Sequence, residues 1–577
     1  MCGIMALLND IYNDDIIQND IIQKAFNNGT SRGPEHSNYI NYSNLSLYFH
    51  RLAINGINVN SNQPLIYDNI VLICNGEIYN YKKLYSVLDI KPYSESDCEI
   101  IIHLYKKYGF NNMLNMLDGV FAFVLYDINL NKVFIARDLF GVRPLYILTQ
   151  TNKSIHLNNY AVASELKVLR HFKNKHNVIS QFTPGTYSSF NLEYNYIYKT
   201  YRFVLEHNTQ FYSNILSIPS IYNSLHKSTN LNIYFNNIYN TICEAVKKRV
   251  IATTERPIAC LLSGGLDSSL IAALVSKYSN KKIDTYSIGM LGSEDLKNAR
   301  IVANHIHSNH HEIVLTKDEF FNAIDKVIYN IESYDTTTVR ASVGNYLVAN
   351  YISKNSDAKV IFNGDGSDEL TGGYIYMLAA PDNIEFDLEC KRLLRDIHFF
   401  DVLRSDKSIS SNGLEPRTPF LDKDFVYNYL SIPIDLRNPK SEFNKNLKLW
   451  DEFSFSKKRP EKLLLRYSVY HNNPTLLPEN VLWRTKEAFS DGVSGNDGNW
   501  FQIIKNNIED LQLNNNNYLT LKDRNHNKPE TNEQMYYRNI FDKYYNNLDN
   551  TIPYFWMPKF IKANDSSART LDIYKTL

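Results

Sequence analysis

The 577-residue sequence predicts two joined domains, an α+β domain followed by an α/β domain built on a parallel sheet. The length is enough for two domains that each bury a core. In the first half, β-like runs such as 45–49 and 70–73 are followed by strand-end and turn signals. In the second half, an apolar run at 258–262 ends at Ser263-Gly264-Gly265 and leads into helical spacing. Such a strand, turn and helix is typical of an α/β sheet.

Composition argues against several classes of function. The formal net charge is zero, which disfavours a nucleic-acid-binding surface. No run of about 18 apolar residues occurs, so no membrane span is expected. The start of the chain does not resemble a secretory signal. Six cysteines without C-x-x-C pairs favour a reducing compartment, with no zinc site and no disulfides. We therefore expect a cytoplasmic protein.

Cys2 is the first candidate functional residue. Removal of the initiator methionine would leave it at the amino terminus, with a thiol and a free α-amine on one residue. An α-amine has a pKa of about 8, so its neutral fraction at pH 7 can accept the thiol proton. A terminal cysteine is therefore a nucleophile with its own base.

Further motifs follow Cys2 in the first half. They are Arg51-Leu52-Ala53-Ile54, Cys74-Asn75-Gly76-Glu77-Ile78-Tyr79-Asn80, Ser96-Asp97-Cys98-Glu99, Leu117-Asp118-Gly119, Ala136-Arg137-Asp138 and Gly141-Val142-Arg143-Pro144. Each alone is explained by a strand end, a turn or a capped helix start. Together with Cys2 they resemble the amino-terminal-nucleophile glutaminase domain of class II amidotransferases, over about residues 2–190. The resemblance implies an αββα Ntn-hydrolase sandwich.

The same resemblance implies the catalytic groups of this domain. Cys2 attacks the side-chain amide of glutamine, and Asn75 with the N–H of Gly76 forms the oxyanion hole. One departure concerns the loop that closes over glutamine in relatives. Their His-Arg-Gly-Pro-Asp is replaced here by Ser31-Arg32-Gly33-Pro34-Glu35.

A glutamine pocket follows from the resemblance as well. Arg51 pairs the α-carboxylate of glutamine through a planar guanidinium. Glu77 and Asp97 face the substrate amine. The expected pocket comprises Arg51, Leu52, Ala53, Ile54, Asn55, Asn75, Gly76, Glu77 and Asp97.

The region from about 190 to 230 is rich in Tyr and Asn and has weak periodicity. We expect a linker of irregular structure at 191–230, between domains at 2–190 and 231–577. After it, the pattern predicts helices near 233–250 and 295–307 and core strands at 283–288 and 360–362.

Glycine or acidic residues stand at three strand ends of the second half, at 263–265, at Gly289 and at 363–369. The carboxyl ends of parallel strands meet at one edge of a sheet, so these residues should form one crevice. Open α/β sheets bind ligands there.

The loop at 263–269 has features of an anion site. Its glycines let the backbone bend and a ligand approach closely, and the first N–H groups of the next helix favour an anion. Ser263, Ser268 and Ser269 add hydroxyl donors, and the Asp267 carboxylate suits magnesium beside phosphate. The run S-G-G-L-D-S-S resembles the pyrophosphate loop of ATP pyrophosphatases. It is not a Walker loop, because no Gly-Lys-Ser/Thr follows.

Three more runs extend this resemblance to the asparagine synthetase domain, from about residue 225 to near the end of the chain. They are Thr336 to Ser342, Glu415 to Asp422 and Trp483 to Asp491. The resemblance implies that Asp267 and Asp368 hold magnesium on pyrophosphate. The implied ATP-binding residues are Leu262, Ser263, Gly264, Gly265, Asp267, Ser268, Ile288, Asn363, Gly364 and Lys486. The implied sheet is doubly wound, with helical additions.

Two departures fall in this second site. Relatives have Ser-Gly-Glu-Gly where this chain has Asn363-Gly364-Asp365-Gly366. The resemblance gives the acidic residue a role in ammonia attack, and Asp365 is one methylene shorter than glutamate. A displacement of order 1 Å can cost roughly a hundredfold in rate. Ala379 stands where relatives have a lysine, which would weaken a phosphate or aspartate contact.

Taken together, the two halves resemble glutamine-hydrolysing asparagine synthetases. The resemblance implies L-aspartate, L-glutamine and ATP as small-molecule substrates, Mg²⁺ as cofactor and a homodimer, with neither nucleic acid nor membrane as partner. Two alternatives remain open. A β-lactam synthetase-like enzyme would share the scaffold, although such enzymes lack the amino-terminal cysteine. A catalytically weakened or silent regulatory protein is compatible with Asp365 and Ala379.

Overall fold

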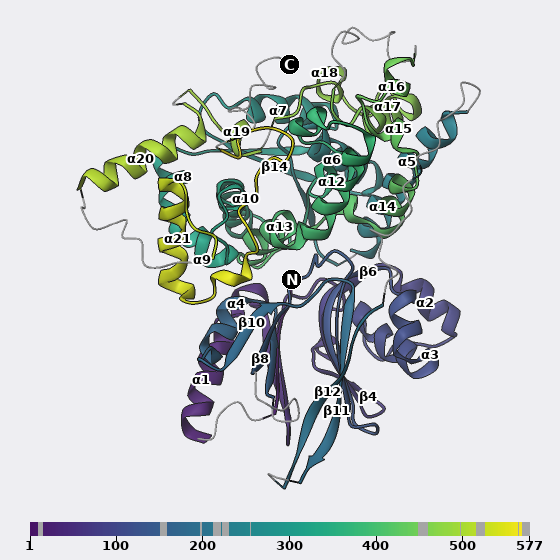
Figure 1. Cartoon of the computed structure of the whole chain (residues 1–577). Helices are drawn as coiled ribbons and strands as arrows, with labels where there is room; N and C mark the ends of the chain where they lie inside the picture. Colours follow the sequence, from purple (N-terminus) through teal and green to yellow (C-terminus); the bar gives the residue numbers. More distant parts are fainter. Residues whose placement is uncertain are drawn as a thin grey trace.

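The computed structural model describes residues 1–9, 15–150, 158–196, 199–211, 221, 230–253, 255–447, 460–487, 489–496, 498–514, 526–563 and 565–567. Figure 1 shows two parts. The purple and blue part contains two facing sheets, and the larger teal-to-yellow part surrounds a third sheet with helices. The amino terminus lies at the junction between the two parts.

Two six-stranded antiparallel sheets form the centre of the first domain. One has the order β10 (Asn177–Gln181), β8 (Tyr146–Gln150), β9 (Tyr160–Ala163), β1 (Gly3–Leu8), β3 (Leu45–Arg51), β2 (His36–Tyr42). The other has the order β12 (Thr200–Gln210), β11 (Thr186–Asn195), β7 (Lys132–Arg137), β6 (Gly119–Asp127), β5 (Ile70–Ile78), β4 (Leu65–Tyr67). The motif at 74–78 therefore belongs to the strand and does not follow it.

Alternation along β1 explains how the layers pack. Ile4 and Ala6 lie in the core between the two sheets, whereas Met5 and Leu7 pack on the helical side. Helices α1 (Asp15–Asn27) and α4 (Leu166–Leu169) cover the first sheet, and α2 (Tyr81–Leu88) and α3 (Ile100–Met116) cover the second. The predicted αββα sandwich is confirmed. Strand β6 is buried on both faces because it lies between the other sheet and the helices.

The expected irregular structure at 191–230 is wrong over its first part. Strands β11 and β12 pair antiparallel along their length and extend the second sheet. Phe190 and Phe203 from this hairpin are buried in the core between the sheets. The outer end of the hairpin carries exposed tyrosines, so its pattern looks irregular in the sequence. Residues 212–220 and 222–229 of the expected linker lie outside the described residues.

A parallel five-stranded sheet forms the centre of the second domain. Its order is β15 (Asn309–Val314), β14 (Asp284–Gly289), β13 (Ile258–Leu261), β16 (Val360–Phe362), β17 (Glu415–Arg417). The chain runs from β13 outward to β15 and then returns to β16 on the opposite side of β13. The strand order therefore reverses between β13 and β16, and this is where doubly wound sheets bind ligands.

Helices cover both faces of this sheet. Ala259 and Cys260 of β13 point to opposite faces and belong to two separate cores. On the Cys260 side lie α5 (Asn232–Ala252), α6 (Leu266–Tyr278), α7 (Glu294–His305), α14 (Lys423–Leu430) and α17 (Leu463–Asn472). On the other side lie α8 (Lys317–Asn322), α9 (Ile324–Ile331), α10 (Thr336–Asn355), α13 (Asp401–Ser410), α20 (Trp500–Asn514) and α21 (Asn532–Tyr545). The predicted doubly wound domain is confirmed.

Additional helices complete the second domain. They are α11 (Ser367–Thr371), α12 (Asn383–Asp396), α15 (Ile434–Arg437), α16 (Glu442–Lys445), α18 (Glu479–Leu482) and α19 (Phe489–Gly492). Across the described helices, we find none with the length and apolar character needed to cross a membrane.

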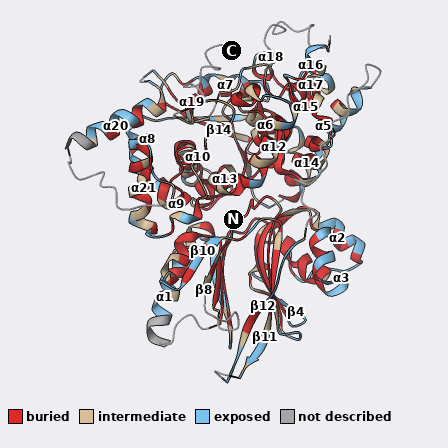
Figure 2. Ribbon diagram, in the orientation of Figure 1, coloured by how far each residue is buried: buried red, intermediate tan, exposed pale blue. Residues whose placement is uncertain are grey.

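The two domains are docked through a buried interface. Figure 2 shows buried segments in red on both sides of the junction. Leu52 and Ile54 of the first domain belong to the same apolar core as α5, α6 and α17. Beside them, the fully buried Arg32 donates to Asp406 Oδ1 at 2.7 Å and to Ser410 Oγ at 2.9 Å on α13. Buried charges of this kind are retained only when paired, so these pairs favour one docking geometry.

Candidate active sites

The first candidate site is a cavity of about 190 Å³ in the second domain. It lies at the carboxyl ends of β13, β14 and β16, at the reversal of strand order. The predicted residues that line it are Leu262, Ser263, Gly265, Asp267, Ser268, Ile288, Asn363, Gly364, Asp365, Asp368 and Lys486. The structure thus brings together segments that are more than two hundred residues apart in the sequence.

The glycine loop at the end of β13 shapes one wall of this cavity. Gly264 has φ +72°, and a Cβ there would lie 2.4 Å from the backbone nitrogen of Ala299 on α7, so only glycine fits. This packing places Gly264 behind the lining residues. The hydroxyls of Ser263 and Ser268 lie 3.0 Å apart across the turn. Helix α6 begins at Leu266 without a side-chain cap, so its first N–H groups can bind an anion.

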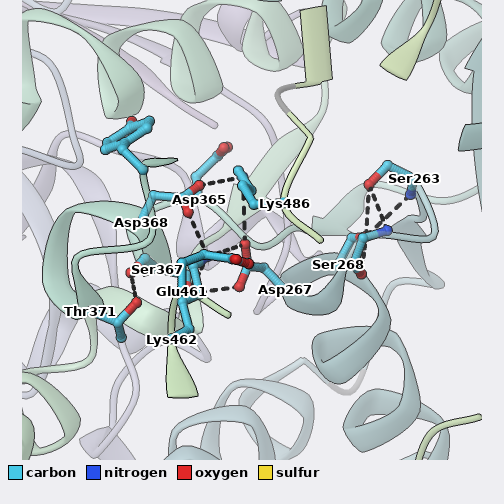
Figure 3. A network of polar contacts seen from close by, with 12 residues as sticks. Ser263, Asp267, Ser268, Asp365, Ser367, Asp368, Thr371, Glu461, Lys462 and Lys486 are labelled. Atoms are coloured by element: carbon cyan, nitrogen blue, oxygen red, sulfur yellow. Dashed lines mark hydrogen bonds and ion pairs between the residues drawn. The ribbon is translucent and has the colours of Figure 1, made fainter. Parts of the chain in front are cut away.

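Asp267, which follows this loop at the start of α6, forms a cluster with Asp368 and two lysines (Figure 3). Lys462 Nζ lies 2.6 Å from Asp267 Oδ2 and 2.6 Å from Asp368 Oδ1. Lys486 Nζ lies 2.6 Å from Asp368 Oδ2, and Ser367 Oγ donates to Asp267 Oδ1 at 2.8 Å. Burial alone would raise the pKa of Asp368, but the two ammonium groups hold it well below its usual range. A single cation thus already touches both carboxylates.

Lys462 is the clearest residue that sequence reasoning missed. Its side chain is 1% exposed, and its backbone has φ +56°, which is unfavourable for a residue other than glycine. It stands at the N-cap of α17, where a positive charge opposes the helix dipole. A lysine at a helix start was the one signal in the sequence that could have identified it.

Asp365 also lines the cavity, near Asp368 and Lys486 in Figure 3, and forms an ion pair with α13. Arg404 NH2 lies 3.0 Å from Asp365 Oδ1 and 3.0 Å from Asp401 Oδ1. Burial raises the pKa of Asp365, although Arg404 opposes this shift. The Asp365 carboxylate is therefore held by a cation where it lines the cavity. Ala379, the second departure, is not among the residues that line the cavity.

The second candidate site surrounds Cys2, immediately before β1. Cys2 Sγ donates to the Leu52 carbonyl at 3.6 Å, and Arg32 Nε donates to the Cys2 carbonyl at 3.0 Å. Asn75 on β5 is fully buried, and neither its amide nitrogen nor its amide oxygen has a hydrogen-bond partner among the described residues. A Cβ on Gly76 would lie 2.8 Å from the Val120 carbonyl, so this position requires glycine. An unpaired buried amide is costly unless a ligand uses it.

Arg51 is buried, and its guanidinium has no carboxylate within ion-pair distance in the part of the chain that the structure describes. Its NH1 donates to the Asn58 carbonyl at 3.0 Å and to Asn62 Oδ1 at 2.5 Å. Its NH2 donates to the carbonyls of Asn55, at 3.4 Å, and of Gly56. Across the described residues, no ion pair to Arg51 is found, and burial lowers its pKa. Its terminal N–H groups fix the surrounding segment, and its positive charge remains available to attract an anion such as a carboxylate.

Glu77 and Asp97 lie nearby and are both almost fully buried. Glu77 accepts from Asn55 Nδ2 at 2.5 Å and pairs with Arg417 NH2 at 3.1 Å. Asp97 Oδ2 accepts from the Ile78 N–H at 2.7 Å, and burial raises the pKa of Asp97 to about 6. Arg417 belongs to β17 of the second domain and was not predicted as a site residue. It lies in the run from Glu415 to Asp422, one of the three runs that carry the resemblance to the family.

The Ser31–Glu35 loop packs against β3 and the predicted pocket. A Cβ on Gly33 would lie 2.4 Å from the His50 carbonyl, which explains the glycine. Glu35 Oε2 accepts from the Ala53 N–H at 2.6 Å, and Glu35 Oε1 pairs with Arg256 NH2 at 2.8 Å. The carboxylate of this loop therefore supports the pocket backbone directly.

Retention of Met1 changes the chemistry of Cys2, because the terminal amine then belongs to Met1. Burial lowers the pKa of that amine to about 6 and raises the pKa of the Cys2 thiol to about 11. Only the thiolate is nucleophilic.

We expect iodoacetamide to alkylate Cys2 at pH 7 at least about tenfold faster in a chain that begins at Cys2 than in one that keeps Met1. Mass spectrometry of the terminal peptide measures both rates, with the buried Cys260 as the internal control. Equal rates would contradict the expectation.

Comparison with known proteins gives matches over both domains. Residues 237–389 and 379–553 match the family described as asparagine synthase, and residues 1–211 match the glutamine amidotransferase domain family. The second match ends where β12 ends. A protein from Homo sapiens named asparagine synthetase (glutamine-hydrolyzing) is 39% identical over 601 residues, covering 100% of this chain and 99% of that protein. Proteins of the same name from Pongo abelii and Bos taurus are 39% and 40% identical, with the same shares covered.

Proposed function

Because the chain belongs to the family of glutamine-hydrolysing asparagine synthetases, we propose that it converts L-aspartate, L-glutamine, ATP and water into L-asparagine, L-glutamate, AMP and diphosphate. The observation that carries this proposal is the cavity where the glycine loop faces two carboxylates and two lysines. A β-lactam synthetase-like activity is disfavoured by Cys2. A silent regulator is disfavoured because both sites keep their charged groups.

The glutamine half-reaction begins at Cys2. After loss of Met1, the α-amine takes the thiol proton, and the sulfur forms a bond to the amide carbon of glutamine. Asn75 and the Gly76 N–H donate to the oxygen on which negative charge develops. The C–N bond then breaks, the proton leaves with ammonia, and water hydrolyses the thioester to glutamate. The buried, unpaired amide of Asn75 supports this role.

The synthetase half-reaction takes place at the glycine loop. An oxygen of the aspartate β-carboxylate attacks the α-phosphorus of ATP, and the bond to diphosphate breaks. The N–H groups at the start of α6 and the ammonium groups of Lys462 and Lys486 stabilise the leaving diphosphate. Ammonia then attacks the β-aspartyl-AMP carbonyl, AMP leaves, and Asp365 accepts a proton from the attacking nitrogen.

Magnesium fits the carboxylate pair of this site. Lys462 shows that one cation can contact Asp267 and Asp368 together. Magnesium is usually bound by one or two carboxylates plus phosphate oxygens. Asp267 and Asp368 supply the two carboxylates. When bound there, the ion would neutralise charge on the phosphates of ATP.

Labelled glutamine tests the overall reaction. With nitrogen-15 in the glutamine amide, we expect the label in the asparagine side chain and one AMP per asparagine. Formation of ADP instead of AMP would contradict the adenylation chemistry. Asparagine formed from ammonium but not from glutamine would contradict the assignment of the first site.

Truncation of Asn75 tests the oxyanion hole. We expect Asn75→Ala to lower kcat for glutamine hydrolysis by about 10²- to 10³-fold with little change in KM, because the amide is needed mainly in the transition state. Steady-state glutaminase assays measure both constants. The control is Asn191→Ala, on the β11–β12 hairpin. A rise in KM with unchanged kcat would assign Asn75 to substrate binding instead.

Two finer expectations belong to this proposal. The six cysteines are all free, which supports the reducing cytoplasm expected from the sequence. The homodimer stays a prediction, which sedimentation of the full chain would test.

A further inference from the structure

Two residues of the second domain, Glu255 and Arg256, reach into the first domain. They lie between α5 and β13, just before the strand that ends at the glycine loop. Arg256 Nε donates to the Ala53 carbonyl at 2.7 Å, and Arg256 NH2 pairs with Glu35 at 2.8 Å. The Glu255 carboxylate accepts from the N–H groups of Gly56, at 2.7 Å, and Ile57, at 3.1 Å.

These contacts act on the segment that surrounds Arg51. Both backbone polar groups of Ala53 are hydrogen-bonded. Its N–H donates to Glu35, and its carbonyl accepts from Arg256. The Gly56 peptide is held in the same way, since its N–H donates to Glu255 and its carbonyl accepts from Arg51. The Glu255 carboxylate of the second domain thus helps to fix the position of the Arg51 guanidinium.

We propose that Glu255 and Arg256 are positioning residues for glutamine, so that the second domain completes the glutamine pocket of the first. The inference rests on the proposed function, in which Arg51 binds the α-carboxylate of glutamine. Neither residue touches the substrate. Together they fix residues 53–57, and that segment holds the Arg51 guanidinium in place through its carbonyls. If residues 53–57 shift, the Arg51 guanidinium shifts with them and its ion pair with glutamine weakens.

The location of Glu255 and Arg256 indicates a role beyond holding the two domains together. The domains already share an apolar core, and the buried Arg32–Asp406 pair holds the interface elsewhere. Glu255 is exposed and Arg256 is partly exposed, so their loss exposes no apolar core. Removing these two side chains should therefore shift residues 53–57 and leave the fold intact.

The test uses the full chain with Glu255→Ala and Arg256→Met. Glutamine affinity is measured by calorimetry in a Cys2→Ala background, and KM and kcat for glutamine hydrolysis are measured with Cys2 present. We expect Kd and KM to rise about tenfold, with kcat changed less than about threefold and ammonium-dependent synthesis unchanged. Arg256→Lys should recover part of the affinity, because lysine keeps the charge beside Glu35 but loses the fork geometry.

Arg300→Met is the matched control. Arg300 also forms an ion pair with a glutamate, Glu312, through Nε–Oε1 at 2.6 Å, on the surface of the second domain. It should change none of these values. An unchanged glutamine Kd in both test variants, or a parallel loss of ammonium-dependent synthesis, would overturn the inference.

Arg51→Met separates failure of the inference from failure of the proposed function. If Arg51→Met weakens glutamine binding and the two test variants do not, the positioning role is wrong and the pocket assignment stands. If Arg51→Met leaves binding unchanged, the pocket assignment is wrong, and the positioning role is wrong with it.

Discussion

Cys2→Ala is expected to lower glutamine hydrolysis by on the order of 10⁴-fold or more and to abolish asparagine formation from glutamine. Ammonium-dependent synthesis should stay within about twofold of the unmodified chain. The reason is structural, because the synthetase cavity is lined by residues between Leu261 and Phe489 and by none from the first domain. The lost thiol makes one weak hydrogen bond, at 3.6 Å, so we expect a stability change of at most about 1 kcal/mol.

The measurement compares asparagine yield from glutamine and from ammonium chloride at equal nitrogen supply. Cys243→Ala removes a buried thiol from α5 of the second domain and serves as the control. It should retain both activities. Continued hydrolysis of glutamine by Cys2→Ala would reject the nucleophile assignment. A parallel loss of ammonium-dependent synthesis would show that Cys2 supports the fold of both sites.

The predicted residues of the glycine loop and of the acidic run after β16 line one cavity, because each group follows directly from a local pattern. Gly264 is needed for a positive φ and for contact with Ala299, and both requirements arise within one strand–turn–helix unit. The acidic run that ends at Asp368 follows β16 in the same way. Parallel strands then place these two local units at one sheet edge without further information.

Three charged residues that enter the two sites from distant segments were not predicted. Lys462 precedes α17, Arg404 lies within α13, and Arg417 ends β17, which is separated from β13 by one strand. Their roles arise from tertiary packing, which brings each arginine or lysine within ion-pair distance of a buried carboxylate. The hairpin at 186–210 was missed for a different reason. Its paired strands are half exposed, so the inward-facing Phe190 and Phe203 were obscured by surface tyrosines and asparagines.

Asp368→Asn should have the largest effect on the second site. We expect synthesis from glutamine and from ammonium to fall together, by on the order of 10³-fold. Glutamine hydrolysis should persist. The substitution removes the carboxylate that Lys462 and Lys486 share, leaving Asp267 as the remaining counter-charge for Lys462. Breaking a buried pair on one side destabilises a fold by about 3 kcal/mol, so the free energy of unfolding should also fall.

The pH dependence of that stability loss has a definite sign. The folded-state pKa of Asp368 lies below its ordinary value, because two ammonium groups outweigh the effect of burial. Its contribution is therefore present above the unfolded pKa of about 4 and is lost as pH falls through the lower folded value. Urea unfolding of the two proteins should differ at pH 7 and converge as pH falls below about 4.

Asp424→Asn is the control for this experiment, since Asp424 is largely exposed and lies 3.9 Å from Lys248. It should change neither synthesis nor unfolding by more than about 0.5 kcal/mol. If Asp368→Asn destabilised the fold but kept full synthesis, the carboxylates would serve only as counter-ions for the lysines. If synthesis failed without any stability loss, the contact between Lys462 and Asp368 would contribute little to the fold, and Asp368 would act on the nucleotide alone. Loss of both, with glutaminase intact, is the result that the shared charge cluster requires.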